Sequence, residues 1–176
     1  MNSGITKHGQ YSNNSMVKVH RKDMSFKEAS LLCELYNYEP VCEMSLDHMF
    51  GKHLYEKLQN ELHINSRDFI YEGINPSYII EFNTGSNGKD SRILIRFREV
   101  HKVNMRGIIK ECNLCVVYSL RYSKYITAYW NEANDNHETL REEQYTKNFN
   151  IEEHLRRTGV LWWKFTQRIC LENEYI

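Results

Sequence analysis

Side chains that can bind anions or exchange protons gather in the second half of this chain. An arginine guanidinium pairs with anionic oxygens through two N–H groups, and histidine, with an ordinary pKa of about 6.5, exchanges protons near neutral pH. Arg96, Arg98, His101, Thr127 and Tyr129 belong to segments with the alternation of β-strands. We therefore predict a candidate active face on a sheet, although no motif in the chain fixes a reaction by itself.

The strands that must position these side chains are predicted from the alternation of apolar and polar residues. Three successive strands of an antiparallel meander are predicted, over residues 92–101, 108–120 and 124–131. An aromatic and β-branched run over residues 78–83 predicts a fourth strand. Residues 84–91 join it to the meander as a hairpin turn, because Gly85 and Gly88 tolerate a positive φ.

The last of these strands decides which hydroxyls reach solvent. Strict alternation puts two sets of side chains on opposite faces, Tyr125, Thr127 and Tyr129 against Ile126, Ala128 and Trp130. We expect the apolar set to pack on helices and the hydroxyls to face outward, on the same face as Arg96 and Arg98. No pattern in a sequence encodes the pairing register, so this shared face is a hypothesis.

Helices are predicted on both sides of the meander. Four helical segments are expected, over residues 25–38, 45–62, 136–145 and 150–171. The first begins with a capping box formed by Ser25 and Glu28. On the second, His48 and His53 are five positions apart and do not share a face, as on a solvated helix surface and unlike a metal site.

Length and composition predict one domain. The 176 residues, 41% of them hydrophobic, can close one core but are short for two. Residues 1–15 are predicted to form a flexible N-terminus and residues 16–176 a single α+β domain. In this domain, N-terminal helices and a C-terminal helical region pack on a four-stranded antiparallel sheet. The 23 basic and 23 acidic residues cancel, so a nucleic acid must be bound by a local patch.

The cysteines indicate a reducing compartment. Five of them, an odd number without framework spacing, are typical of free thiols that pack as small apolar groups. Cys112 and Cys115 form a lone C-x-x-C, and in a strand their side chains point to opposite faces, so we predict neither a metal site nor a redox pair. Without a signal peptide or an apolar run of membrane length, the protein is expected in the cytoplasm and away from membranes.

The order of N-terminal helices, an antiparallel meander and a closing strand that reads Tyr125-Ile126-Thr127-Ala128-Tyr129 resembles the barnase, EndoU, colicin and RelE group of bacterial toxin ribonucleases. In many toxin domains of that group the last strand ends in a similar I-T-A-Y phrase. The likeness covers residues 78–145 at most. Trp130 stands where EndoU-like members often have a proline, and no set of two histidines and a lysine has a recognisable spacing.

The resemblance implies cleavage of RNA, with tRNA among the targets, by attack of the ribose 2′-hydroxyl on the adjacent phosphate, without metal or cofactor. Such a reaction needs a base, an acid and cations on the phosphorane oxygens. His101 and His137 are the base and acid candidates, Arg96 is the phosphate ligand, and Thr127 and Tyr129 orient the phosphate. Further residues are expected to hold RNA: Arg98, Lys102, Arg106, Lys124 and Trp130. An immunity or antitoxin protein that covers the arginine face is also implied.

Each candidate has an ordinary structural interpretation as well. A histidine at a strand end, such as His101, or before a helix, such as His137, is often a solvated or capping residue. Arg96 and Arg98 can guard a sheet edge and pair with nearby glutamates. Thr127 and Tyr129 are common strand residues.

Two other functions stay open. Twelve tyrosines offer contact area at low entropic cost, which is typical of a small cytosolic interaction protein, such as a phage or viral inhibitor of a host protein. The other is an RNA-binding module that does not cut. A cleft that joins a histidine to the arginines favours a nuclease, and a flat apolar patch favours an inhibitor. A basic aromatic groove without a positioned histidine favours binding alone.

Overall fold

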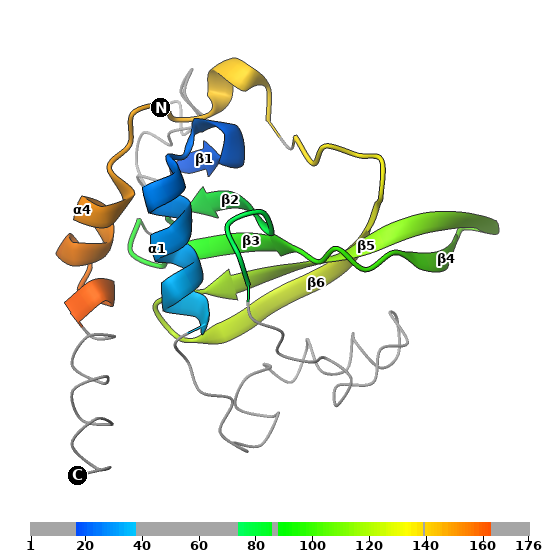
Figure 1. Cartoon of the computed structure of the whole chain (residues 1–176), viewed down its shortest axis with the longest axis horizontal. Helices are drawn as coiled ribbons and strands as arrows, with labels where there is room; N and C mark the ends of the chain where they lie inside the picture. The colour runs from blue at the N-terminus through cyan, green and yellow to red at the C-terminus, as the bar shows by residue number, and fades with distance from the viewer. Residues whose placement is uncertain (1–16, 38–73, 86–87, 139, 163–176) are drawn as a thin grey trace, which may run out of the picture.

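The computed structural model describes residues 17–37, 74–85, 88–138 and 140–162, which form an α+β fold around one antiparallel sheet. Six strands make up this sheet (Figure 1): β1 (Lys18–His20), β2 (Ile79–Asn83), β3 (Arg92–Arg96), β4 (His101–Met105), β5 (Ile108–Ser119) and β6 (Lys124–Glu132). The helical elements of the described residues are η1 (Arg21–Asp23), α1 (Phe26–Asn37), η2 (Glu142–Gln144) and α4 (Ile151–Arg157).

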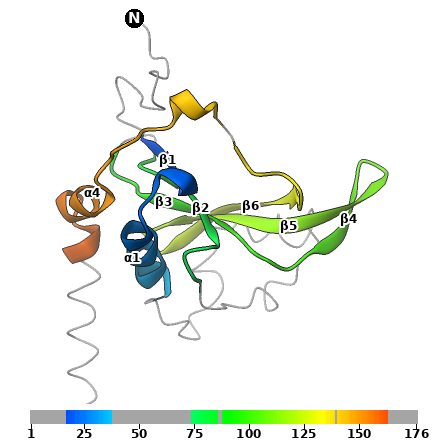
Figure 2. The same ribbon diagram turned by 45° about the horizontal axis from the view of Figure 1, so that its top comes forward.

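The sheet is organised around β5, its longest strand. The pairing order is β1-β2-β3-β5, and β6 pairs with the other edge of β5. β3 pairs with residues 115–119 of β5, and β4 pairs on the same edge with residues 108–112. β3 and β4 therefore behave as one long strand with an interruption at residues 97–100. The outer part of β4 and β5 projects from the rest of the fold as a ribbon (Figures 1 and 2).

One face of the sheet, which we call the helix face, holds the main core. Its apolar side chains come from every long strand and include Phe82, Ile93, Ile95, Val116 and Ala128. Leu32 from α1 and Leu155 from α4 pack in the same cluster and are fully buried. Removing such side chains from water is the main source of stability in a fold of this size.

The capping box predicted at Ser25 begins α1. The Ser25 hydroxyl accepts a hydrogen bond from the Glu28 backbone N–H at 3.2 Å, and the Glu28 carboxylate accepts one from the Ser25 backbone N–H at 2.9 Å. The predicted apolar stripe, including Leu32 and Tyr36, is buried against the sheet. Phe26, which was predicted to belong to this stripe, is 80% exposed because it lies on the first turn beyond the edge of the core.

The end of α1 is tied directly to the segment before β2. The Asn37 side-chain amide donates to the Ile74 carbonyl at 2.5 Å and accepts from the Ile74 backbone N–H at 2.6 Å. One side chain thus replaces a pair of backbone hydrogen bonds between positions 37 residues apart. The helix predicted over residues 45–62, with its histidines, lies outside the described residues, as does the predicted N-terminus 1–15.

The predicted four-stranded sheet has two strands too few. β1 is three residues long, which is too short for its alternation to be read in the sequence. β4 was missed because the turn between β4 and β5 consists of Arg106 and Gly107, without the Asn-Gly or Asp-Gly signal of a tight hairpin. Both turn residues have a positive φ, 57° and 86°, as a two-residue type I′ turn requires.

A β-bulge in β6 changes the faces of its first residues. Tyr125 and Thr127 pair with consecutive residues of β5, so Ile126 is the extra residue of the bulge. Tyr125 turns to the helix face, where its hydroxyl is hydrogen bonded to that of Tyr36, and Ile126 is 37% exposed. The predicted faces of Tyr125 and Ile126 were therefore wrong, whereas the alternation from Thr127 onward is confirmed.

The second face of the sheet, which we call the far face, is also partly covered. Ile80, Leu94 and Cys115 are buried there in a small apolar cluster, so β3 is not the half-buried strand that its alternation predicted. After β6, residues 133–138 and 140–147, which we call the crossing segment, make hydrogen bonds with far-face residues of several strands.

The C-terminal region contains less helix than predicted. Residues 136–145 were expected to be an α-helix, but only the 3-10 turn η2 forms, because their backbone and side chains bond to the sheet and not to one another. α4 confirms the start of the helix predicted over residues 150–171. The Asn150 side chain caps it by accepting from the Glu153 backbone N–H at 2.9 Å. Within the described residues, no helix has the length and apolarity needed to span a membrane.

Candidate functional site

The sheet register aligns several of the predicted side chains on the far face. Arg96 pairs with Cys115, and Cys115 pairs with Tyr129, so these three side chains point the same way from adjacent strands. Thr127 lies two residues from Tyr129 on β6 and shares the face. The hypothesis that Arg96 shares a face with Thr127 and Tyr129 is confirmed.

Arg96 anchors the crossing segment. Its guanidinium donates to the backbone carbonyls of Glu132 and Ala133 at 2.9 and 2.8 Å and to that of Asp135. Its Nε donates to the Asn113 side chain at 3.0 Å. Four of the five N–H groups of this guanidinium are therefore occupied within the protein, which makes Arg96 a positioning residue for the chain after β6.

His137, in the crossing segment, lies against Tyr129. Its Nε2 is 2.8 Å from the Tyr129 hydroxyl, and the two rings stack with centroids 5.7 Å apart. Burial lowers the pKa of His137, although the Glu81 and Asp135 carboxylates oppose the shift. Its Nδ1 is buried and has no hydrogen-bond partner among the described residues. The imidazole is therefore neutral at pH 7.

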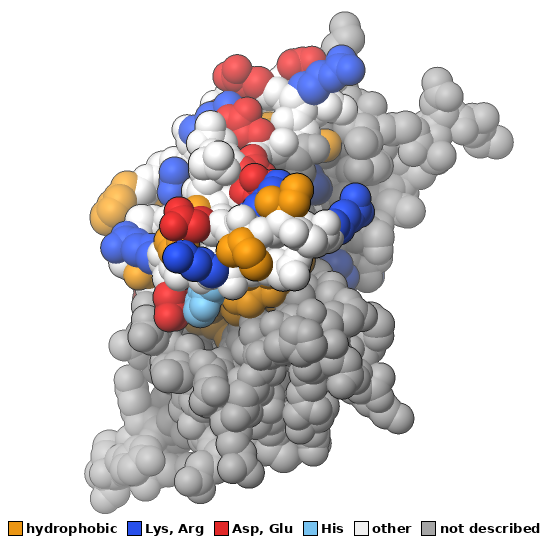
Figure 3. Space-filling model, turned by 90° about the vertical axis from the view of Figure 1, so that its right-hand side faces the viewer, with side chains coloured by type: hydrophobic (Ala, Val, Ile, Leu, Met, Phe, Trp, Pro, Cys, Tyr) orange, Lys and Arg blue, Asp and Glu red, His pale blue; other side chains and the backbone are white. Residues whose placement is uncertain are grey.

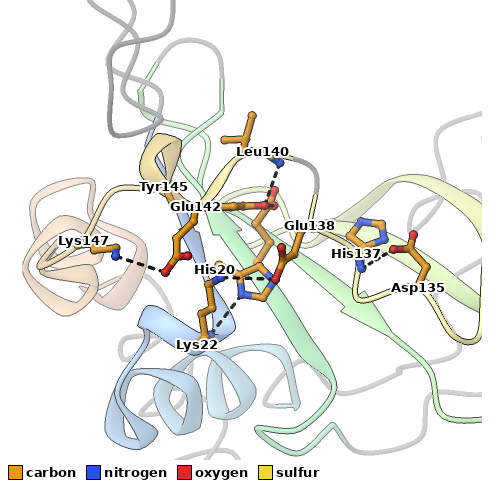
Figure 4. Close-up of polar contacts among 10 residues, drawn as sticks. His20, Lys22, Asp135, His137, Glu138, Leu140, Glu142, Tyr145 and Lys147 are labelled. Carbon is orange, nitrogen blue, oxygen red and sulfur yellow. Dashed lines mark hydrogen bonds and ion pairs between the residues drawn. The ribbon is translucent and has the colours of Figure 1, made fainter.

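Glu81 joins the crossing segment to the first strands. It is 2% exposed, its carboxylate is 3.2 Å from the Lys18 ammonium, and it accepts a hydrogen bond from the Tyr145 hydroxyl at 3.3 Å. The same hydroxyl accepts from the Leu140 backbone N–H at 3.2 Å (Figure 4). A buried carboxylate is tolerated because a cation and a hydroxyl satisfy it.

Residues 97–100 form a wide bulge between β3 and β4. These four residues lie opposite only two residues of β5. The Asn113 side chain fills the gap by donating to the carbonyls of Arg98 and Glu99 at 3.4 and 3.0 Å. Bulges of this kind redirect side chains and are frequent beside functional sites.

Arg98, which the bulge displaces from the ladder, meets Arg21 at Ser77. The Arg98 guanidinium is hydrogen bonded to the Ser77 hydroxyl and lies over the Tyr78 ring, 4.4 Å from its centroid. Arg21 donates to the Ser77 carbonyl at 3.1 Å. Two guanidinium groups from distant parts of the chain thus converge, an arrangement that an anion stabilises.

His20, the last residue of β1, was not predicted as a site residue. It is 6% exposed and packs edge-on against the Tyr145 ring at 5.2 Å. Its Nδ1 accepts from the Lys22 backbone N–H at 3.4 Å, which leaves the proton on Nε2 when the ring is neutral. Burial, reinforced by Lys22, lowers the pKa of His20. Its buried Nε2 has no partner among the described residues.

These elements surround one pocket of about 550 Å³. Five basic or imidazole side chains and one carboxylate contribute to its lining: His20, Arg21, Lys22, Arg96, Arg98 and Glu138. The Glu138 carboxylate lies 3.4 Å from the Lys22 ammonium, and Figure 4 shows both next to His20. Because cations outnumber the single carboxylate, an anionic ligand fits this pocket best.

His101 and Trp130 lie outside this lining. Their rings pack against each other with centroids 5.0 Å apart, and Trp130 belongs to the helix-face core. His101 Nε2 is 3.5 Å from the Glu99 carboxylate. The structure therefore brings His137 and Arg96 together but leaves His101 apart from both.

The remaining predicted cations are spread over the sheet. Lys102 and Arg106 are on the projecting ribbon, at β4 and at its turn. Lys124 starts β6 and pairs with Ser119, at the opposite end of the strand from the crossing segment. These three lysines and arginines do not belong to the pocket lining.

No group of three or more His, Cys, Asp or Glu side chains in the described part of the chain could hold a metal ion. Cys112 and Cys115 point to opposite faces of β5, as predicted from the strand period. Burial raises the pKa of Cys115 to about 12, so this thiol stays protonated at neutral pH.

Comparisons with known proteins identify no relative: no family model, no curated protein and no solved structure matches the chain. The resemblance to toxin ribonucleases therefore stays a prediction.

Proposed function

We propose that this chain is a metal-independent endoribonuclease of the toxin type that binds RNA in the pocket between β1, the bulge at residues 97–100 and the crossing segment. A ribose 2′-hydroxyl attacks the adjacent phosphate, and tRNA is among the substrates. One observation supports this above all: a single pocket is lined by a histidine, four cations and a carboxylate. Proton transfer and a phosphorane intermediate need these chemical groups.

Arg98 and Arg21 are assigned to the scissile phosphate. Both guanidinium groups already meet at Ser77, and the Tyr78 ring beneath Arg98 limits the orientations that Arg98 can adopt. A preorganised pair of guanidinium groups binds a dianionic phosphorane more tightly than a monoanionic phosphodiester, because the interaction grows with the charge. Binding of this kind accelerates the reaction.

Glu138 and Lys22 are assigned to the proton transfers. Glu138 accepts the proton of the 2′-hydroxyl, and Lys22, whose ammonium is 3.4 Å from that carboxylate, gives a proton to the leaving 5′ oxygen. His20, neutral because burial lowers its pKa, donates its Nε2–H to a phosphate oxygen. The products are a 2′,3′-cyclic phosphate and a 5′-hydroxyl.

The residues predicted as catalytic on the far face have a positioning role in this proposal. Arg96 holds three carbonyls of the chain after β6, and Tyr129 holds His137, the direct neighbour of Glu138. Both contacts fix the direction in which the crossing segment presents Glu138 to the pocket.

The test is incubation of total cellular RNA and of purified tRNA with the full chain in the presence of EDTA. We expect discrete fragments with 2′,3′-cyclic phosphate ends, and a loss of rate of about 100-fold or more in Glu138→Gln and Arg98→Ala. Lys124→Ala, which removes a cation at the other end of β6, is the matched control and should cleave like the wild type.

Circular dichroism of each variant separates loss of activity from loss of the fold. Intact RNA at high concentrations of folded protein would overturn the proposal. Tight binding of RNA without fragments would favour a non-catalytic RNA-binding module. A cell that makes an active enzyme also needs an immunity or antitoxin protein, which we expect to be acidic and to cover the arginine-lined pocket.

A second candidate function, inhibition of another protein without catalysis, is favoured by the projecting ribbon. Ile108 and Ile109 at its end are 61% and 62% exposed, and exposed apolar groups of this size often mark a protein-binding surface. A phage or viral inhibitor would leave RNA intact in the assay above and would form a stable complex with one host protein.

A further inference from the structure

The ribbon formed by β4, the Arg106–Gly107 turn and residues 108–111 of β5, which we call the arm, extends beyond the layers of the fold (Figure 2). Neither β3 nor β6 accompanies it. β3 pairs with β5 only from Cys115 onward, and β6 ends at Glu132, opposite Cys112. An isolated two-stranded ribbon is only marginally stable in water, so additional contacts would favour its ordered form.

The edge of β5 on the β6 side is open along the arm. The Glu111 carbonyl points to this edge, because it accepts from the Ala133 backbone N–H at 2.9 Å. Backbone groups of alternate residues point to the same edge of a strand, so those of Ile109 point there as well. In the described part of the chain, the β6 side offers Ile109 no strand partner. The sheet thus has a notch in line with β6.

The side chains beside this notch are apolar and exposed. Ile109 is 62% exposed and Ile108 is 61% exposed, on opposite faces of the arm. Figure 3 views the molecule from the side to which the arm projects and shows hydrophobic side chains among lysine, arginine and acidic ones. Open edges in natural sheets are usually guarded by a charged residue or a proline. At Ile109 neither is present.

We infer that the arm pairs with the arm of a second copy of this chain, through antiparallel pairing of the two β5 edges about a two-fold axis at Ile109. In this register Ile109 lies opposite its own symmetry mate, and Ile108 lies opposite Lys110 of the other chain. Gly107 lies opposite Glu111. Each pair joins residues of the same face, so the four strands β4-β5-β5-β4 continue one pleated sheet.

A second copy fits the notch because the segment is complementary to itself. The two Ile109 side chains cover each other on one face, and Ile108 packs along the aliphatic stem of Lys110 on the other. The Lys110 ammonium is already paired with Glu132 of its own chain, so the contact leaves no cation without a partner. Glycine at position 107 puts no side chain in the way of Glu111.

The first test is the mass of the full chain by sedimentation and by light scattering over a range of concentrations. We expect a dimer of twice 21.2 kDa and a shift toward monomer in Ile109→Lys, which puts two cations on the axis. Asn104→Lys, on the outer edge of β4, is the matched control and should stay a dimer. A wild-type chain that is monomeric at every concentration would overturn the inference.

The second test uses the symmetry. Ile109→Cys should form a disulfide-linked dimer under mild oxidation, since a residue on the axis faces itself at a distance that a disulfide can bridge. Asn104→Cys and the wild type, with its own thiols, should stay unlinked under the same conditions. A dimer in which Ile109→Cys does not link would use another surface, and this result would also overturn the inference. Neither readout depends on RNA cleavage.

Discussion

The two faces of the sheet are built from the same strands but are stabilised in different ways. On the helix face, twenty buried residues form one apolar cluster with α1 and α4. On the far face, the corresponding cluster has three buried residues, and the rest of the cover is a polar network around Glu81, Arg96 and His137. Apolar burial is tolerant of small shifts, whereas hydrogen-bonded groups must keep their geometry. The comparison indicates that the helix face holds the fold together while the far face positions chemical groups.

The largest effect is expected for truncation on the helix face. Leu32→Ala removes a fully buried side chain between α1 and the sheet and should lower the free energy of unfolding by about 2–5 kcal/mol. Leu94→Ala, in the small far-face cluster, should cost less because fewer apolar neighbours surround the cavity. Urea denaturation of both variants measures the difference. Equal losses would contradict the division between the faces.

Removal of the far-face anchor should have an intermediate effect. Arg96→Ala leaves the carbonyls of Glu132, Ala133 and Asp135 without their donor, and we expect a loss of about 1–3 kcal/mol. Hydrogen exchange should show faster exchange in the crossing segment than in α1. Arg92→Ala, which breaks a salt bridge to Asp90 near the other end of the same strand, is the control. Uniform loss of protection across the sheet would argue against a local anchor.

Acid should weaken the far face more than the helix face. Burial lowers the pKa of His20 and His137, so the unfolded chain binds protons that the folded chain does not once the pH falls below 6.5. Stability is complete above that value and is lost progressively as the pH falls toward the lowered pKa. His137→Gln should reduce the slope of stability against pH between 8 and 5.

A helix-face histidine provides the reference for this measurement. The pKa of His154 is also lowered by burial, and its ring contacts Phe82 and Ser91. His154→Gln should likewise reduce the pH slope, but amide exchange at acidic pH should rise near α4 and not in the crossing segment. Identical exchange patterns in the two variants would contradict separate responses of the faces.

The smallest effect is expected for His101→Ala. The side chain is 41% exposed and contacts only the Trp130 ring and the Glu99 carboxylate, so stability should change by less than about 0.5 kcal/mol. RNA cleavage, if present, should persist, because His101 does not line the pocket. Loss of cleavage in a folded His101→Ala chain would move the site from the far face to the base of the arm.

Local patterns predicted those parts of the fold that depend on neighbouring residues. The capping box at Ser25, the hairpin of β2 with β3 and the meander of β5 with β6 each leave a periodic or capping signal within a few residues. The two bulges leave none, because an extra residue such as Ile126 is defined by its partner strand and not by its own sequence. This is why Tyr125 was assigned to the wrong face.

The candidate site was harder to predict because distant segments build it. Arg96 and Tyr129 were found because both are on strands with clear alternation. His20 was missed because β1 is short, and nothing near residue 20 indicates that Arg98 and Glu138 lie around it. A lone histidine before two basic residues has no distinctive spacing. Its role becomes visible only when the sheet register and the crossing segment are known.

The contact between Asn37 and Ile74 has a consequence for how this chain can vary. A single amide side chain brings together the two ends of the stretch between them. A connection whose ends coincide constrains the length of the intervening chain only weakly, since the entropy of closing a loop grows slowly with its length. Position 37 is therefore a natural junction, at which segments of different size can be exchanged while the sheet and its pocket keep their geometry.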